Sequence, residues 1–190
     1  MNRFLLLLMV EYAIIIRTGR DERLVIFGID PGYATVGWGC IRYERSRFTP
    51  IDFGVILTPA DMEFPLRLQC IHTELSALLT KYPSDFLAVE KLYFKNNQKT
   101  AIDVAQARGV ILLAAKQSRI PIFEYTPLQV KSAVTGYGNA KKSQVMEMTR
   151  RLLGYKEVPK PDDAADALAI SICHAQCCGT PLKRRLANLK

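Results

Sequence analysis

Four carboxylate side chains stand at positions where packing alone does not require an acid. Asp30 ends the apolar run LVIFGID, and Glu90 ends a second such run, DFLAVE. Asp163 and Asp166 lie three residues apart in PDDAADALAIS, and this spacing places them on one face of a helix. If the four acids converge, cations must offset their repulsion, and a ligand set of oxygens alone favours Mg²⁺ or Mn²⁺ over zinc. Two such ions can activate a water and stabilise the leaving oxygen of a phosphodiester.

Each acid also has an ordinary structural explanation when it is taken alone. Asp30 precedes Pro31-Gly32 and suits a turn, and Asp163 suits the first turn of a helix, where the dipole favours an acid. Asp162 is adjacent and could compete for the role of Asp163, but it is the expected helix cap and is therefore the second choice. The four acids together, beside a basic half of the chain, favour one shared site.

The basic residues are concentrated in one part of the chain. The 190 residues include 26 Lys and Arg against 18 Asp and Glu, a net charge of +8. Residues 81–160 contain 14 basic and six acidic residues, which equals the whole net charge. Such a surface attracts polyanions, above all nucleic acid, although a simply solvated face has the same composition. The hydrophobic content of 49% excludes a disordered chain, and the apolar run 4–10 is too short to span a membrane.

The elements that must position these acids follow from the hydrophobic pattern. Three strands at 24–30, 33–44 and 47–58 form an antiparallel meander, with further strands at 85–90 and 120–125. Helices are expected at 63–82, 100–117, about 126–136, 141–153 and from Asp162 or Asp163 to about Cys178, with a loop at 91–99. This order predicts an α/β fold with a five-stranded mixed sheet flanked by helices, not a doubly wound parallel sheet. The strands that end in Asp30 and Glu90 can then lie side by side.

The two ends of the chain form separate segments. We expect residues 1–23 to be an N-terminal extension, residues 24–178 one domain, and residues 179–190 a basic C-terminal tail. Near that tail, Cys173, His174, Cys177 and Cys178 are close in sequence. A zinc site is conceivable there, but a second pair of ligands is missing, so packing in a reducing cytoplasm is the favoured interpretation.

Five segments together resemble the RuvC family of bacterial Holliday-junction resolvases. They are FGIDPGYATVGWG (27–39), AVEKLYFKNN (88–97), QARGVILLAA (106–115), EYTPLQVKSAVTGYGNAKKSQV (124–145) and PDDAADALAIS (161–171). The resemblance covers about residues 24–176. It implies a ribonuclease H-like fold, a homodimer, and Mg²⁺-dependent cutting of two opposed strands at a four-way DNA junction. It also implies the branch-migration proteins RuvA and RuvB as partners, and a cytoplasmic location.

The resemblance also implies roles for individual residues. Two metal ions would be bound by Asp30, Glu90, Asp163 and Asp166, with Asp30 bridging both ions and Mn²⁺ able to replace Mg²⁺. The DNA-binding residues would be Lys131 and Lys142 on the scissile phosphate, and Tyr93 with Phe94 stacking on an unpaired base at the junction. Tyr93 stands where the family often has Phe.

Three other functions are alternatives to a junction endonuclease. A junction-binding module without cleavage gains nothing from acids beside phosphates. A ribonuclease acting on RNA–DNA hybrids is the enzyme alternative. An actin-like kinase shares the Asp-Pro-Gly turn, but that fold needs a second domain and more than 190 residues.

Helix 100–117 should also carry a second apolar surface, which pairs with the same helix of a second copy of the chain. The candidates for this surface are Val104, Ile111 and Leu112.

Overall fold

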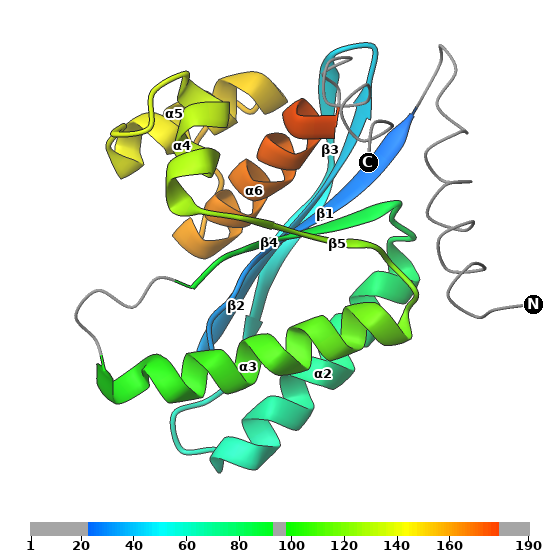
Figure 1. Cartoon of the computed structure of the whole chain (residues 1–190), viewed down its shortest axis with the longest axis vertical. Helices are drawn as coiled ribbons and strands as arrows, with labels where there is room; N and C mark the ends of the chain where they lie inside the picture. The colour runs from blue at the N-terminus through cyan, green and yellow to red at the C-terminus, as the bar shows by residue number, and fades with distance from the viewer. Residues whose placement is uncertain (1–22, 93–97, 179–190) are drawn as a thin grey trace, which may run out of the picture.

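A five-stranded mixed sheet forms the centre of the computed structural model (Figure 1). The structure describes residues 23–92 and 98–178, and leaves the side chains of 98–100 undescribed. The strands lie in the order β3-β2-β1-β4-β5. The β1–β2 and β2–β3 pairs are antiparallel, and the β1–β4 and β4–β5 pairs are parallel, which confirms the predicted arrangement. The bounds are β1 Leu24–Asp30, β2 Thr35–Glu44, β3 Arg47–Leu57, β4 Phe86–Glu90 and β5 Ile122–Tyr125.

Helices cover both faces of this sheet. On one face lie α2 (Phe64–Lys81) and α3 (Gln98–Gln117), and on the other α4 (Pro127–Thr135), α5 (Lys142–Leu153) and α6 (Asp162–Cys178) (Figure 1). Alternation along β1 divides its side chains between two cores. Phe27 and Ile29 pack with α2 and α3, whereas Ile26 packs with Ala88 and α6. Successive side chains along β1 therefore point alternately to the α2–α3 layer and to the layer of α4, α5 and α6.

The element boundaries differ from the sequence-based prediction by a few residues, for visible reasons. Strand β5 begins at Ile122 rather than at 120, because the Ile120 N–H donates to the Ala115 carbonyl and closes the end of α3. Strand β2 begins at Thr35 rather than at 33. Tyr33 lies in the turn before the strand, where its carbonyl accepts a hydrogen bond from the Thr58 hydroxyl. The predicted short connection between β2 and β3 is confirmed. Its two residues, Arg45 and Ser46, have φ of 48° and 63°, as a two-residue hairpin turn requires.

Local sequence signals set the bounds of α4, the helix that carries Lys131. Thr126 caps α4: its hydroxyl accepts from the Gln129 N–H at 3.2 Å, and the Gln129 side chain accepts from the Thr126 N–H at 2.8 Å. Pro127 follows at the first helical position, as predicted. The helix ends at Gly136, whose φ of 77° is the left-handed conformation that glycine tolerates best.

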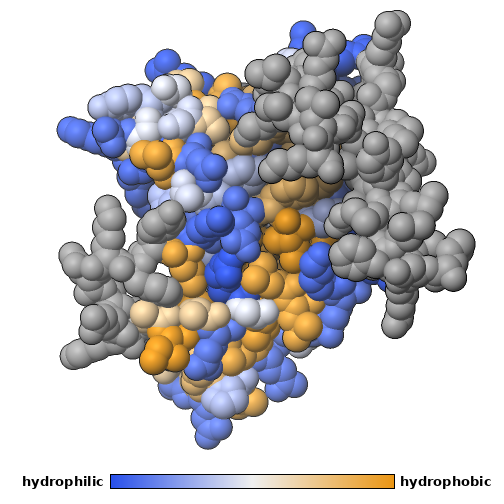
Figure 2. All heavy atoms as spheres, in the orientation of Figure 1, coloured by the Kyte–Doolittle hydropathy of each residue, from blue (hydrophilic) through white to orange (hydrophobic). Residues whose placement is uncertain are grey.

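The exposed residues differ in hydropathy between the two helical layers. In the orientation of Figure 1, hydrophobic residues are exposed along α3, and hydrophilic residues lie between α3 and the group of α4, α5 and α6 (Figure 2). Within the ranges that the structure describes, no helix combines the length and the apolar character needed to cross a membrane.

Candidate active site

Two of the predicted acids are brought together by the parallel pairing of β1 and β4. The register runs from Ile26 opposite Phe86 to Ile29 opposite Val89, so that the next residues along the two strands are Asp30 and Glu90. Both are half-buried. Gly28 and Ala88 face α6, and Asp30 and Glu90 lie two residues further along the same strands. Because side chains alternate along a strand, both acids lie on the face of the sheet that α6 covers. The strand-end argument from the sequence is thereby confirmed for the placement of this pair.

Glycines in the sheet allow α6 to bring the other two acids close. A Cβ on Gly37 would lie 2.0 Å from the Asp163 carbonyl oxygen, and a Cβ on Gly28 would lie 2.2 Å from the Ala167 carbonyl oxygen. Helix α6 therefore crosses the sheet at backbone contact, where any side chain would push it away. Gly37 is the residue opposite Asp30 in the β1–β2 ladder, so the first turn of α6 lies directly beside Asp30.

The four acids behave electrostatically as one cluster. The pKa of Asp30 is raised to about 7, first by burial and then by the charges of Glu90, Asp166 and Asp163. The pKa of Glu90 is also raised to about 7, by burial and by Asp166. Burial likewise raises the pKa of Asp166. Near neutral pH the cluster therefore resists full ionisation unless positive charge is supplied.

Two lysines on the α4–α5 side supply part of that charge. The Lys142 ammonium lies 2.9 Å from Asp166 Oδ2 and 3.5 Å from Asp162 Oδ2. Both Lys131 and Lys142 act to lower the pKa of Glu90, against the effect of burial. The structure thus places Lys131 and Lys142, the two lysines that the family resemblance implied, close enough to act on the acids.

The carboxylate oxygens of the cluster fit a hard divalent cation, although the side chains do not form a preorganised metal site. Carboxylate oxygens are the ligands that such ions prefer, and the Lys142 ammonium already stands as a cation on Asp166. Among residues 23–92 and 98–178, no three His, Cys, Asp or Glu side chains form a group that could hold a metal ion as they stand. Asp163 contributes to the shift of Asp30, whereas Asp162 is 63% exposed and contacts Lys142. Tyr93 and Phe94 lie outside the described residues.

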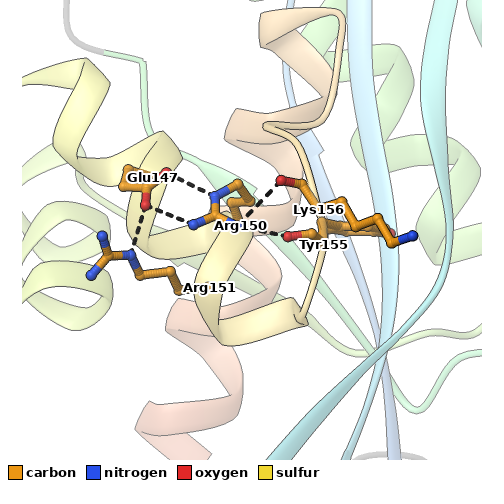
Figure 3. Close-up of polar contacts among 5 residues, drawn as sticks. All are labelled: Glu147, Arg150, Arg151, Tyr155 and Lys156. Carbon is orange, nitrogen blue, oxygen red and sulfur yellow. Dashed lines mark hydrogen bonds and ion pairs between the residues drawn. The ribbon is translucent and has the colours of Figure 1, made fainter.

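Helix α5 is tied to the chain segment that leads into α6. The Arg150 guanidinium donates to both carboxylate oxygens of Glu147 at 2.8 Å and to the Tyr155 carbonyl at 2.8 Å (Figure 3). Arg151 donates to the same Glu147 carboxylate at 2.6 Å, and together the two arginines lower the pKa of Glu147 to about 2. This network fixes the turn after α5, and hence the entry to the helix that carries Asp163 and Asp166.

Comparison with known proteins identifies the family. The family model for crossover junction endodeoxyribonuclease RuvC matches residues 26–174. A crossover junction endodeoxyribonuclease RuvC from Halothermothrix orenii is 57% identical over 151 residues, which are 80% of this chain and 92% of that protein. One from Syntrophomonas wolfei is 56% identical over 149 residues, 78% of this chain and 87% of that protein. The chain belongs to the RuvC family.

Solved structures of RuvC agree with this fold. Thermus thermophilus RuvC in complex with a Holliday junction substrate superposes with a TM-score of 0.77 at 34% identity, covering 81% of this chain and 94% of that one. The yeast mitochondrial Holliday junction resolvase Ydc2 has a TM-score of 0.64 at 14% identity, covering 92% and 90% of the two chains, and supports the fold alone. The predicted ribonuclease H-like fold class is confirmed.

The sequence analysis missed the glycines that let this RuvC-family site assemble. Gly37 and Gly39 are spaced two apart in TVGWGCIRYE, so both face α6 from one side of β2. A glycine within a strand often marks a close approach of another backbone, and this repeated spacing was the available signal.

The cysteine and histidine group at the far end of α6 has a different environment from the acids. His174 is fully buried, its ring centroid lies 4.9 Å from that of Phe86 and 4.6 Å from that of Phe123, and its Nδ1 is 2.7 Å from the Tyr125 hydroxyl. Its Nε2 is 3.1 Å from Cys178 Sγ, and burial lowers its pKa to about 4. These contacts give the imidazole a packing role between β4, β5 and α6.

Proposed function

We propose that this chain is a Mg²⁺-dependent endonuclease that resolves four-way DNA junctions by paired, symmetric cuts. The observation that carries the proposal is the convergence of Asp30, Glu90, Asp163 and Asp166 beside Lys131 and Lys142. The relatives are named as crossover junction endodeoxyribonucleases, and the T. thermophilus RuvC structure holds a Holliday junction substrate. Both support the same substrate for this chain. The activity would serve recombination and repair of DNA in the cytoplasm.

Within this proposal Asp30, Glu90, Asp163 and Asp166 would hold two divalent ions. The bound ions would supply an activated water and stabilise the leaving oxygen of the phosphodiester. Asp30 and Glu90 must both be ionised to act as ligands, and their pKa values of about 7 in the absence of metal mean that ion binding and proton release are coupled. Mn²⁺ has the same preference for oxygen and should substitute.

Lys131 and Lys142 are proposed to contact the scissile phosphate. Both act on the electrostatics of Glu90, so a phosphate beside the acids would lie within reach of their charge. Positive charge placed there stabilises the additional negative charge of the transition state. Tyr93 and Phe94 are proposed to stack on an unpaired base at the centre of the junction.

A junction with two-fold symmetry calls for two active sites, and we propose that α3 provides the dimer interface. Of the three residues expected at this interface, Val104 and Leu112 are half-buried, with Leu112 packed against the core, and the prediction for Ile111 is wrong. Ile111 is fully buried in the core under α3, because that side of the helix packs on its own domain. The exposed apolar side chains are Ile102, at 67%, and Leu113, at 52%, eleven residues and so about three turns apart. Gly109 lies between them with open space above it, and a second helix could approach there.

Sedimentation tests the interface directly. Leu113→Glu places a charge on this exposed face and should convert a dimer into a monomer at micromolar concentration, without loss of the folded state. Lys116→Glu, an exposed change one turn further along α3, is the control for the added acid. A wild-type chain that sediments as a monomer would remove the dimer from the proposal. RuvA and RuvB are the proposed partners of the dimer on the junction.

One gel tests the activity itself. The substrates are a synthetic four-way junction, a linear duplex of the same sequence and an RNA–DNA hybrid, each with Mg²⁺ and with EDTA. Symmetric nicks in the junction alone, dependent on Mg²⁺, are the expected result. Binding without nicks would instead favour a junction-binding module, and cutting of the hybrid would favour a ribonuclease.

A further inference from the structure

Lys142 makes an ion pair with an acid that the proposed function needs as a metal ligand. It is the first residue of α5, and its ammonium lies 2.9 Å from Asp166 Oδ2. Asp162, 3.5 Å away, holds the same ammonium from the exposed side. The Lys142 side chain is 56% exposed, and that of Asp166 is 30% exposed. The lysine therefore covers the carboxylate from the solvent side.

This pairing and metal binding compete for the same oxygen. A divalent ion on Asp166 would face the ammonium at a few ångströms, and two positive charges that close repel each other. The Lys142 ammonium holds Asp166 Oδ2 at 2.9 Å, so this oxygen must be released before it can bind an ion. Release of Asp166 by Lys142 is one movement that the geometry requires.

A phosphate group can draw the lysine away. The stem of Lys142 is a flexible four-carbon chain, and more than half of the side chain is in solvent, so the ammonium can turn outward without disturbing α5. Lys131 acts on Glu90 together with Lys142, so a phosphate bound between the two lysines would lie next to the acids. The same phosphate would offer Lys142 a new partner.

We propose that Lys142 is an internal cation that holds Asp166 until a DNA phosphate withdraws it, so that DNA binding opens the metal site. This inference rests on the proposed function, since it assigns Asp166 to the metal and Lys142 to the phosphate. Linkage makes the coupling reciprocal: metal on Asp166 frees Lys142 for DNA, as DNA frees Asp166 for metal. The arrangement lowers the metal affinity of the free protein by the small factor that a partly exposed ion pair supplies, and substrate restores it.

Mn²⁺ binding in the absence of DNA is the first test, measured by calorimetry on the full chain. Lys142→Gln should bind Mn²⁺ about two- to fivefold more tightly than the wild type, the range expected for loss of a partly exposed ion pair. Lys141→Gln is the matched control. It removes the same charge from the adjacent exposed residue, and it keeps the cap, because there the Lys141 backbone N–H donates to Gln144. Equal effects of the two substitutions would overturn the proposal.

Junction affinity in EDTA is the second test, because no metal is present and nothing is cut. Asp166→Asn should tighten binding of a four-way junction in the wild-type background, since it releases Lys142 and removes a negative charge. In the Lys142→Gln background the same substitution should gain about two- to fivefold less, which is the coupling that a double-mutant cycle isolates. An equal gain in both backgrounds would show that Lys142 and Asp166 act independently and would overturn the proposal.

The two tests separate this inference from the proposed function. A wild-type chain that cuts the junction with Mg²⁺ but shows additive effects in the cycle loses only the role of Lys142 as internal cation. A chain that neither binds nor cuts a junction loses the proposed function itself. Melting curves of every variant identify any substitution that unfolds the domain. For such a variant, Lys142→Met replaces Lys142→Gln and Asp166→Ala replaces Asp166→Asn.

Discussion

The two halves of the acidic cluster are held in different ways. Asp30 and Glu90 are fixed by strand register at the ends of β1 and β4, are half-buried, and have pKa values raised to about 7. Asp163 and Asp166 stand in the first turns of α6, and Asp166 is paired with the partly exposed side chain of Lys142. The sheet half is fixed by backbone hydrogen bonds of the ladder, and both halves carry a cost of burying charge, because burial also raises the pKa of Asp166. The helix half is adjustable and is already partly neutralised.

This difference indicates a division of labour. The sheet fixes where the metal must bind, because two strand ends in one parallel ladder cannot shift independently. The helix side determines when it binds, because its contacts are side-chain ion pairs near the surface, which are weak and easily exchanged. Mutations on the sheet side should therefore affect the chemistry, whereas mutations on the lysine side should affect coupling and binding.

Asp30→Asn should have the largest effect, because Asp30 couples to all three of the other acids. Asn keeps the shape and removes the charge, so cutting of a junction should fall by roughly 10²–10³-fold, the scale of a single catalytic group. Junction binding should survive or improve, since a carboxylate repels phosphates. Single-turnover cutting and EDTA binding assays measure the two quantities. Cutting above a few per cent of the wild-type rate would remove Asp30 from the metal site.

Gly37→Ala should show how far the sheet half depends on the position of α6. The added methyl would meet the Asp163 carbonyl at 2.0 Å, so the first turn of α6 must move away from Asp30. A displacement of about 1 Å in a catalytic site costs up to roughly 100-fold in rate. Cutting should therefore fall roughly 10- to 100-fold.

Gly39→Ala is the matched comparison for Gly37→Ala. It lies two residues further along β2 and faces the same helix, but its Cβ would meet the Leu168 side chain at 2.8 Å rather than the backbone at Asp163. It should lower the melting temperature and leave most of the cutting rate. Equal loss of cutting in the two variants would mean that the contact at Asp163 has no special importance.

The sequence was sufficient for the parts of this site that depend on strand ends and helical spacing. A buried run that ends in an acid predicted Asp30 and Glu90 at one edge, and a spacing of three predicted Asp163 and Asp166 on one face. The close approach of α6 was not predicted, because it depends on which strand faces which helix. The ion pair of Lys142 with Asp166 was not predicted either, since a contact between α5 and α6 has no local signature. The error over Ile111 has the same origin: apolar content does not say which side of α3 faces its own core.

The pH dependence of stability should reveal the buried charge of the sheet half. The folded pKa of Asp30 is about 7, above the ordinary 3.8, so the folded chain binds more protons between these values and loses stability as pH rises from about 4 to 7. At about 1.4 kcal/mol per pKa unit, the loss is at most roughly 4 kcal/mol. Urea unfolding in EDTA at pH 4 to 8 measures the total decline. Asp30→Asn should remove the share that belongs to Asp30, whereas Glu90, whose pKa is also about 7, keeps its own share. Glu90 and Asp166 add to the decline, and His174 adds an opposite slope, in both proteins, so the difference between them reports the Asp30 carboxylate and its coupling to the other acids.

The smallest effect should appear on the lysine side, in the salt dependence of junction binding. Each lysine that neutralises a phosphate contributes about 0.9 to the slope of log affinity against log salt. Lys131→Ala and Lys142→Ala should each lower the slope by about one, so that raising salt from about 50 to 200 mM weakens binding by a factor roughly three to four smaller than in the wild type. Tyr93→Ala removes no charge and should leave the slope unchanged. Unchanged slopes in both lysine variants, with normal cutting, would place the two side chains on a solvated face and leave the acids to act without them.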